Sequence, residues 1–150
     1  MGNQKFSGWS ATMSRRAIIT LAAVVAALCA VVVTPASAGA NCASGYHCVF
    51  YTTVDSSKHS YFNSDPDFWN DFFSGGNGTG SGQRVFNNVW AASNSSTSGY
   101  ESHYYTNTYY TGFLWCVNPG DTVYELPASL KDAASSMRLR GTTSISCIGS

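Results

Sequence analysis

Two stretches in the second half of the chain decide the predicted fold: Tyr105-Thr-Asn-Thr-Tyr-Tyr110-Thr-Gly112 and Asp132-Ala-Ala-Ser135-Ser136-Met137-Arg138-Leu139. The first sets two aromatic residues and then a glycine at the spacing of a strand that folds back on itself, because glycine adopts a positive φ at little cost. The second places short oxygen-bearing side chains before residues 137–140, which alternate between apolar and basic residues as a half-buried strand does. Both stretches therefore predict β-structure.

The first 38 residues have the order of a secretory signal peptide. A leader containing Arg15 and Arg16 precedes an almost unbroken apolar run at residues 17–33, and Ala36-Ser37-Ala38 is a small-x-small cleavage site. A membrane-spanning helix is the alternative, but the run is at the short limit for a span and the cleavage site favours removal. We expect cleavage after Ala38, with Ala38-Gly39-Ala40 as a second site. This leaves residues 39–150 as one secreted, extracellular domain that has no membrane contact.

The charge of the secreted part excludes one class of partner. Residues 39–150 carry eight acidic and five basic side chains, a net charge of −3. Nucleic-acid binding needs clustered Lys and Arg against the phosphates. No such cluster occurs in the sequence, so we expect no nucleic-acid partner, and we expect the protein to act as a monomer.

Four cysteines remain after signal cleavage: Cys42, Cys48, Cys116 and Cys147. An even number in an exported protein predicts two disulfides, for which three connectivities exist. We favour Cys42–Cys48, which closes a small N-terminal loop, and Cys116–Cys147, which ties the C-terminal tail to a central strand. A zinc site is the rival interpretation, disfavoured because no Cys-x-x-Cys pair occurs and the four residues are scattered.

The rest of residues 39–150 follows an all-β pattern without an amphipathic helix of ordinary length. Short runs rich in Val, Thr and aromatic residues are separated by Gly, Ser, Asn and Pro. The turn chemistry of Asn118-Pro119-Gly120-Asp121 fits this pattern. The predicted strands cover residues 47–53, 59–62, 84–86, 103–106, 112–117, 122–126 and 137–140.

One short stretch interrupts this pattern. Four aromatic residues recur at helical spacing behind a cap at Asp65 or Asp67: Phe68, Trp69, Phe72 and Phe73. They predict one or two helical turns that bury their aromatic rings in the core. A functional aromatic patch at the surface is the alternative.

A weak internal repeat divides the domain into two halves. Phe50-Tyr51-Thr52 begins the first half as Tyr104-Tyr105-Thr106 begins the second, and residues 87–92 correspond to residues 131–136. Two such halves can pack face to face as a sandwich with four strands in each. The polar residues 93–99 then connect the halves, and residues 74–82 form a second, flexible loop.

The motifs together resemble a known family. Cys42-Ala-Ser-Gly-Tyr46-His-Cys48, the stretch from Tyr105 to Gly112, Asn118-Pro119-Gly120 and Asp132-x-x-Ser135-Ser136 are similar to those of the bacterial secreted metalloprotease inhibitors with a βγ-crystallin-like fold. The resemblance implies a βγ-crystallin-like sandwich of two Greek-key motifs with two disulfides and one short helical turn. It also implies a peptidase inhibitor whose partner is an extracellular protease.

In that family a short loop between the halves enters the protease cleft like a substrate, stiffened by a nearby disulfide, and such pre-organisation lowers the entropy lost on binding. The corresponding residues of this chain are Ser96, Thr97, Ser98, Gly99 and Tyr100, with Tyr104 supporting them. The connector, residues 93–101, contains no cysteine and is rich in Ser, so we expect it to be flexible. Tyr105 and Tyr110 are expected to be structural, whereas Tyr100, Tyr104 and Tyr109 could form a contact surface.

We expect no enzyme activity and no catalytic residue. The sequence holds no Gly-x-Ser-x-Gly, His-Glu-x-x-His or P-loop motif. Glu101 and His103 are the only neighbouring carboxylate and imidazole, and their spacing places them on one face of a strand. That arrangement suits a surface ion pair as well as a catalytic pair.

The same resemblance raises calcium, which takes several hard oxygen ligands. The candidate ligands are Asn88, Asp132 and Ser135, but alanines and Lys131 stand where the family pattern has further oxygen ligands. Any calcium binding is therefore expected to be weak, and the alternative is that Asp132 and Ser135 hold a corner by hydrogen bonds to the backbone. A cell-wall or glycan-binding module that uses exposed tyrosines and tryptophans is a further alternative to inhibition.

Overall fold

The computed structural model describes residues 39–149; the predicted signal peptide, residues 1–38, lies outside the described residues. Seven strands and two 3-10 turns are found there. The strands are β1 (His47–Phe50), β2 (Lys58–Tyr61), β3 (Ala91–Asn94), β4 (Tyr100–Tyr105), β5 (Phe113–Val117), β6 (Thr122–Val123) and β7 (Ser136–Gly141). The turns are η1 (Phe68–Asn70) and η2 (Thr108–Tyr110). The predicted all-β class is confirmed, and no helix within residues 39–149 has the length and hydropathy needed for a membrane span.

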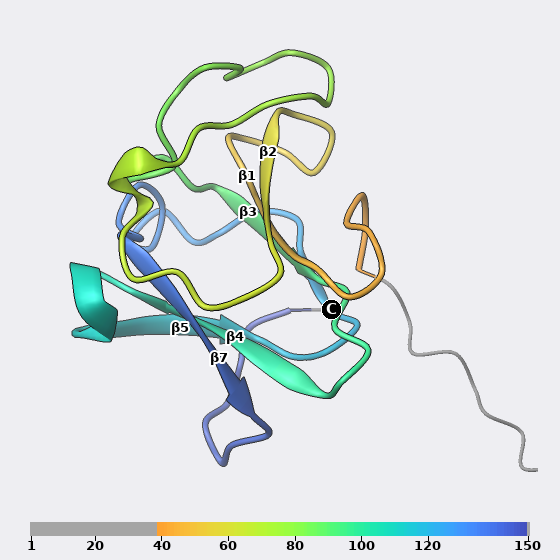
Figure 1. Ribbon diagram of the computed structural model, residues 1–150, viewed down its shortest axis with the longest axis vertical. Helices are drawn as coiled ribbons and strands as arrows, with labels where there is room; N and C mark the ends of the chain where they lie inside the picture. The colour runs from red at the N-terminus through yellow and green to blue at the C-terminus, as the bar shows by residue number, and fades with distance from the viewer. Residues whose placement is uncertain (1–38, 150) are drawn as a thin grey trace, which may run out of the picture. The chain divides into compact units, whose positions relative to one another are not determined.

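Two antiparallel sheets form the domain, one of four strands in the order β2-β1-β3-β6 and one of three in the order β5-β4-β7. Figure 1 shows β1, β2 and β3 in one layer and β4, β5 and β7 crossing below them. β6 belongs to the second half of the chain but pairs with β3 of the first, with Ala92 opposite Val123. Conversely, Asp65 of the first half pairs with Met137 of β7 through two backbone hydrogen bonds of 2.8 and 2.9 Å. Each half thus lends a segment to the sheet of the other.

The two halves meet at a corner where each half donates one backbone hydrogen bond to the other. Asn87 and Asp132 both have positive φ, 56° and 53°. The Asn87 N–H donates to the Ala134 carbonyl at 3.0 Å, and the Asp132 N–H donates to the Val89 carbonyl at 3.2 Å. Ala134 lies two residues after Asp132, and Val89 lies two residues after Asn87. Asn87 and Asp132 therefore occupy equivalent positions at this corner.

The side chains of this corner repeat the relationship. The Ser135 hydroxyl donates to Oδ1 of Asn87 at 3.2 Å, and the Trp90 indole N–H donates to Oδ1 of Asp132 at 2.8 Å. Ser135 lies three residues after Asp132, and Trp90 lies three residues after Asn87. The sequence comparison set Asn87 opposite Lys131, whereas the geometry of this corner sets Asn87 opposite Asp132.

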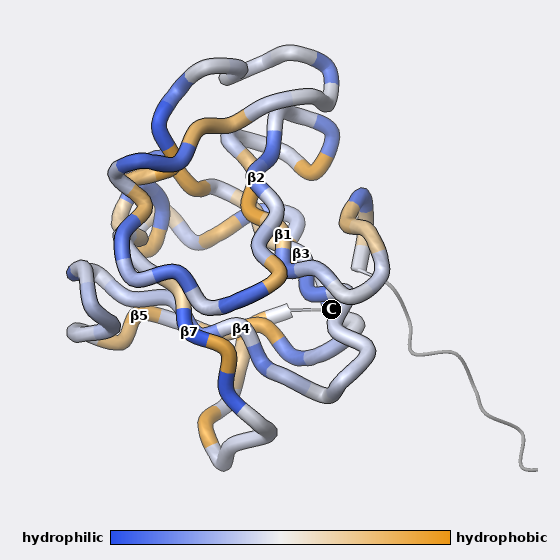
Figure 2. Tube along the Cα trace, in the orientation of Figure 1, coloured by the Kyte–Doolittle hydropathy of each residue, from blue (hydrophilic) through white to orange (hydrophobic). Residues whose placement is uncertain are grey.

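The hydrophobic core fills the space between the sheets. Its centre is the Tyr104 ring, which is fully buried and stacks on the Trp115 ring with centroids 3.9 Å apart. The other buried members of this cluster are Val49, Tyr61, Phe68, Phe73, Val85, Val89, Ala92, Val117, Val123, Leu126, Ala134 and Met137. In Figure 2 the segment that leaves β2 and passes β7, residues 63–67, is strongly hydrophilic, so it forms an outer edge of the sandwich.

The structure corrects the strand prediction at three places. The first half holds three strands, β1 to β3, and not the four expected in each half. Residues 84–86 form no strand, and only a single bridge joins Phe72 to Arg84. The strand β3 was not predicted, although all four of its residues are buried and it lies between β1 and β6. Its sequence, Ala-Ala-Ser-Asn, has no β-branched or aromatic residue, and backbone pairing on both sides overrides that low propensity.

The aromatic stretch after Asp67 is a single 3-10 turn. The Asp67 carboxylate caps it by accepting from the Trp69 N–H at 3.0 Å. Phe68 and Phe73 are buried as predicted, but the prediction was wrong for Trp69 and Phe72, which are 56% and 46% exposed. A turn this short presents only part of its surface to the core, so the remaining rings face outward.

Both disulfides have the pairing favoured from the sequence. Cys42 is bonded to Cys48, and Cys116 is bonded to Cys147. The first closes a small loop that ends in β1, because Cys48 is the second residue of that strand. The second ties the C-terminal tail to β5, where the Ile148 N–H also donates to the Cys116 carbonyl at 2.8 Å.

Candidate functional site

The predicted contact loop connects β3, an inner strand of one sheet, to β4, the middle strand of the other. Ser96 is buried, whereas Thr97, Ser98 and Gly99 are exposed and the Tyr100 ring is 45% exposed. The loop therefore projects from two strands that are each paired on both sides.

The Asn94 side chain braces the base of this loop. Its Nδ2 donates to the Tyr100 carbonyl at 2.8 Å and to the Val117 carbonyl at 3.0 Å, while its Oδ1 accepts from the Ser96 N–H at 2.9 Å. Asn94 is fully buried, so these bonds are shielded from competition with water. The expectation of a flexible connector was wrong for its first residues, because Ser93 and Asn94 belong to β3.

A second brace comes from Ser96. Its hydroxyl oxygen accepts from the Ser98 N–H at 3.3 Å and from the Tyr100 N–H at 3.2 Å. Gly99 completes the turn with a φ of 73°, a conformation that other residues adopt only with strain. The exposed tip is thus a hydrogen-bonded turn whose shape is fixed before any partner binds.

The N-terminal disulfide loop holds the neighbouring residue Ser95. Backbone hydrogen bonds join the Gly45 N–H to the Ser95 carbonyl at 2.7 Å and the Ser95 N–H to the Tyr46 carbonyl at 2.9 Å. The Ser95 hydroxyl also donates to the Cys42 carbonyl at 2.9 Å. The loop contains no cysteine of its own, but the Cys42–Cys48 loop is bonded to its base.

A cavity of about 360 Å³ lies beside the loop. Its lining includes Gly45, His47, Phe62, Ser96, Thr97, Ser98, Tyr100 and Leu139. The Phe62 ring is 62% exposed and meets the Tyr46 ring edge-on with centroids 5.5 Å apart. The loop tip therefore stands at the margin of a hollow with an aromatic rim.

His47 forms part of the wall of this cavity and is 2% exposed. Its Nδ1 lies 2.5 Å from the Ser102 hydroxyl, so it connects β1 to β4. Burial lowers the pKa of His47 to about 4. The imidazole is therefore neutral at neutral pH.

Tyr104 does not belong to the candidate site. It was predicted to support the contact loop from the surface, but its side chain is fully buried in the core. Tyr105 is buried as predicted, and the Tyr109 ring is 74% exposed in η2. Alternation along β4 turns Tyr104 inward against Trp115, so only Tyr100 of these tyrosines lies at the loop.

The structure also overturns the interpretation of Glu101 and His103 as a surface pair. Each is 1% exposed, and the His103 Nε2 lies 2.7 Å from the Glu101 Oε2. Across the sheet His103 is opposite Cys116, which carries the Cys116–Cys147 disulfide. The i, i+2 spacing was visible in the sequence, but the cross-strand partner was not.

The candidate calcium ligands are only partly brought together. Asp132 and Ser135 lie at the corner described above, with Asn87 rather than Asn88 facing Ser135. The Asn88 amide instead donates to the carbonyls of Arg84 at 3.0 Å and Phe86 at 3.3 Å. The corner oxygens of Asn87 and Asp132 accept hydrogen bonds from other side chains, so protein donors occupy positions that a cation would use.

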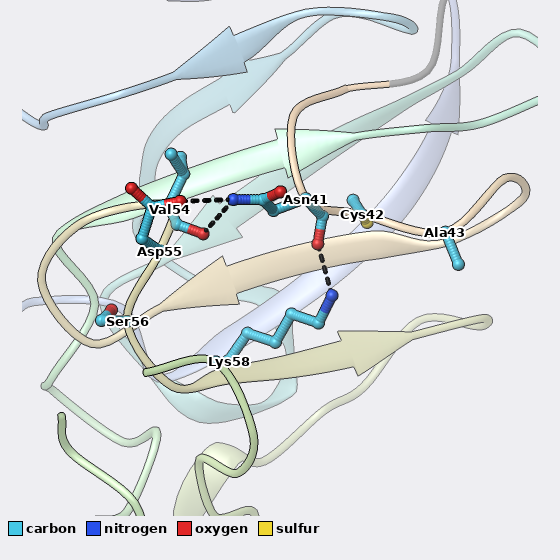
Figure 3. Close-up of a pocket in the computed structure, with 8 residues that line it drawn as sticks. Asn41, Cys42, Ala43, Val54, Asp55, Ser56 and Lys58 are labelled. Carbon is cyan, nitrogen blue, oxygen red and sulfur yellow. Dashed lines mark hydrogen bonds between the residues drawn. The ribbon is translucent and has the colours of Figure 1, made fainter. Parts of the chain in front are cut away.

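A second cavity of about 440 Å³ lies at the N-terminal segment. Figure 3 shows the Asn41 amide directed at the Val54 carbonyl and the Asp55 carboxylate, with distances of 2.9 and 2.8 Å. The Lys58 ammonium, from β2, donates to the Asn41 carbonyl. These polar groups bind one another and fasten the segment before Cys42 to the first sheet.

Comparisons with protein-family models, with curated proteins and with solved structures found no match for this chain.

Proposed function

We propose that this protein is a secreted inhibitor of extracellular metalloproteases that blocks the protease cleft with its loop of residues 96–100. It would act by shape, as a monomer and without a catalytic residue of its own. The loop tip would lie in the cleft as a substrate does, with Tyr100 at its edge.

The fold we propose for it is a βγ-crystallin-like pair of Greek-key motifs. Support comes from the pairing order, in which β1, β2 and β3 of the first half correspond to β4, β5 and β7 of the second. Further support comes from the exchange of segments, with β6 on the first sheet and Asp65 on the second. The reciprocal corner at Asn87 and Asp132 is what a duplicated motif predicts.

The observation that carries the inhibitor proposal is the double brace of the loop by Asn94 and Ser96. Each side chain that is ordered only on binding costs about 0.5–1.5 kcal/mol of affinity. A loop that is ordered beforehand avoids much of that loss and resists the distortion that proteolysis needs. In this chain, buried hydrogen bonds take the place of the disulfide that stiffens the loop in the family it resembles.

The test is a titration of the purified protein against a thermolysin-like metalloprotease, with hydrolysis of a short peptide substrate as the signal. We expect inhibition at micromolar concentration or below, with the loop uncleaved by intact-mass analysis. A serine protease in the same assay is the control and should be unaffected. A folded protein that leaves the metalloprotease fully active would rule the proposal out.

A second candidate is binding to cell-wall glycans, favoured by the exposed aromatic group around Trp69. The Arg84 guanidinium lies over the Trp69 ring at 4.6 Å and over the Phe72 ring at 5.0 Å. These contacts hold the two exposed rings in place, and sugar rings stack on exposed aromatic rings. Pull-down on insoluble wall polysaccharide would test it: Trp69→Ala should abolish retention, and Tyr124→Ala, which removes another exposed ring, should not.

A further inference from the structure

The cavity beside the contact loop has a buried imidazole with one unused nitrogen in its wall. His47 lines this cavity and is 2% exposed, and its Nδ1 is held by the Ser102 hydroxyl. Its Nε2 has no hydrogen-bond partner among residues 39–149. The unpaired side-chain atoms that are sealed from solvent in that range are the Tyr104 hydroxyl and the Trp115 indole nitrogen, so Nε2 of His47 is not sealed. A nitrogen in this position calls for a water or a ligand as its partner.

Exposed side chains of the same wall carry further unused polar groups. The Asn63 amide and the hydroxyls of Thr97 and Ser98 make no hydrogen bond within the described part of the chain. The amide has both donors and an acceptor, and each hydroxyl can donate and accept. No Lys, Arg, Asp or Glu residue is among those that line the cavity, and His47 is neutral at neutral pH. The wall therefore suits an uncharged ligand that carries several hydroxyl groups.

Aromatic rings flank these polar groups. The Phe62 ring is 62% exposed and the Tyr100 ring is 45% exposed, and both residues line the cavity. The edge-on contact with the Tyr46 ring, at 5.5 Å between centroids, helps to hold Phe62 in place. A pyranose ring presents C–H groups on its faces and hydroxyls around its edge. It therefore needs an aromatic surface together with several hydrogen-bonding groups, and this cavity has both.

We propose that the cavity binds one neutral pyranose ring, packed against Phe62 and hydrogen-bonded to Asn63 and to Nε2 of His47. A sugar hydroxyl both donates and accepts, so it pairs with Nε2 in either tautomer of the imidazole. The cavity volume of about 360 Å³ is near the lower end of the range of about 300–1,000 Å³ for ligand sites. That volume suits a single ring better than an extended chain.

This site is independent of the two functions proposed above. It borders the contact loop through Thr97, Ser98 and Tyr100, but sugar binding is measured without a protease, so either proposal can fail alone. The exposed rings of Trp69 and Phe72 do not line this cavity. Binding of a free sugar here is therefore distinct from retention on a polysaccharide by the surface around Trp69.

The experiment titrates isotope-labelled protein with four neutral monosaccharides: glucose, galactose, mannose and N-acetylglucosamine. We expect at least one of them to bind with a Kd of about 1 mM, as a small ligand with few contacts does. The NMR shift changes should be centred on the amides of Gly45 and Ser98 and on Nε2 of His47. Glucuronate, whose carboxylate would meet no cationic partner, should bind about tenfold more weakly or not at all. Glycerol, which has hydroxyls but no ring, should cause no shift changes at the same concentration.

Variants at exposed side chains test the contacts without disturbing the core. Phe62→Ala should weaken sugar binding about tenfold or more, and Asn63→Ala should weaken it about three- to tenfold, as loss of one hydrogen bond does. Trp69→Ala and Tyr124→Ala, which remove exposed rings elsewhere, should leave the Kd unchanged. Folded protein that binds none of the four sugars, binds glucuronate equally well, or binds sugar equally well without the Phe62 ring overturns the proposal.

Discussion

The Asn94 side-chain amide donates a 2.8 Å hydrogen bond to the Tyr100 carbonyl, across the loop that connects the two sheets. The bond joins the last residue of β3 to the first residue of β4, so it closes the loop at its base. Because Asn94 is fully buried, the loop and the sandwich core are one hydrogen-bonded unit. The shape of the exposed tip is thus a property of the fold.

Asn94→Ala should therefore lower the stability of the fold. The substitution leaves the Ser96 N–H and the carbonyls of Tyr100 and Val117 without their buried partner, and each unsatisfied group costs about 1–3 kcal/mol. We expect a loss of about 3 kcal/mol in the free energy of unfolding, measured by urea denaturation. Asn70→Ala, at an exposed asparagine of η1, is the control and should change it by less than about 0.5 kcal/mol.

The loop brace could not be predicted from the sequence. Ser and Asn are abundant both in flexible linkers and in hydrogen-bonded turns, so residues 93–99 read as a linker when taken alone. Only the pairing of β3 with β1 and β6 reveals that Asn94 is buried and directed at the loop.

The fold class and the disulfides could be predicted, because the alternation of strand residues and the even number of cysteines can be read directly from the sequence. The buried group of Glu101, His103 and Cys116 could not be, since it depends on strand register. The same limit applied to Tyr104, whose inward direction is set by its partner Trp115 rather than by its tyrosine-rich neighbours.

Stability should fall as the pH drops below neutrality because of His47. The pKa of His47 is about 4 in the folded protein and about 6.5 when unfolded, so the unfolded chain binds the extra proton across that window. The contribution of His47 to the free energy of unfolding is complete above pH 6.5 and is lost progressively down to about pH 4. Between pH 7 and pH 5 we expect a loss of about 2 kcal/mol in the free energy of unfolding.

Urea denaturation of His47→Gln and of the control His59→Gln at both pH values isolates the contribution of His47 to this pH dependence. The His47→Gln protein should lack most of the 2 kcal/mol fall, whereas His59→Gln should keep it. Equal pH dependence in all three proteins would mean that His47 is not the group that titrates.

The two disulfides should differ in their contribution to stability. Cys116 and Cys147 are 31 residues apart, and Cys42 and Cys48 are 6 apart. Chain-entropy arguments give about 4 kcal/mol for the longer loop and about 2 kcal/mol for the shorter one. Thermal unfolding of Cys116→Ala/Cys147→Ala should therefore occur at a lower temperature than that of Cys42→Ala/Cys48→Ala; the reverse order would contradict this account.

Substitutions at Tyr104 test whether it acts in the core or at the contact surface. Its hydroxyl has no hydrogen-bond partner within the described residues, so Tyr104→Phe should change the free energy of unfolding by less than about 1 kcal/mol. Tyr104→Ala should cost about 3–5 kcal/mol, because it empties the space beside Trp115. Tyr104→Phe should leave protease inhibition unchanged. A folded Tyr104→Phe protein that inhibits more weakly than the wild type would mean that Tyr104 belongs to the contact surface.

The most direct test of the central claim compares inhibition of a thermolysin-like protease by two matched variants. Ser98→Glu places a charge on the exposed tip of the contact loop, and Ser81→Glu places the same charge on the exposed glycine-rich loop. We predict that the wild-type and Ser81→Glu proteins inhibit equally and that Ser98→Glu raises the inhibition constant about tenfold or more, as expected for a residue at the centre of an interface. Equal inhibition constants for both variants, or none for the folded wild type, would contradict occlusion by this loop.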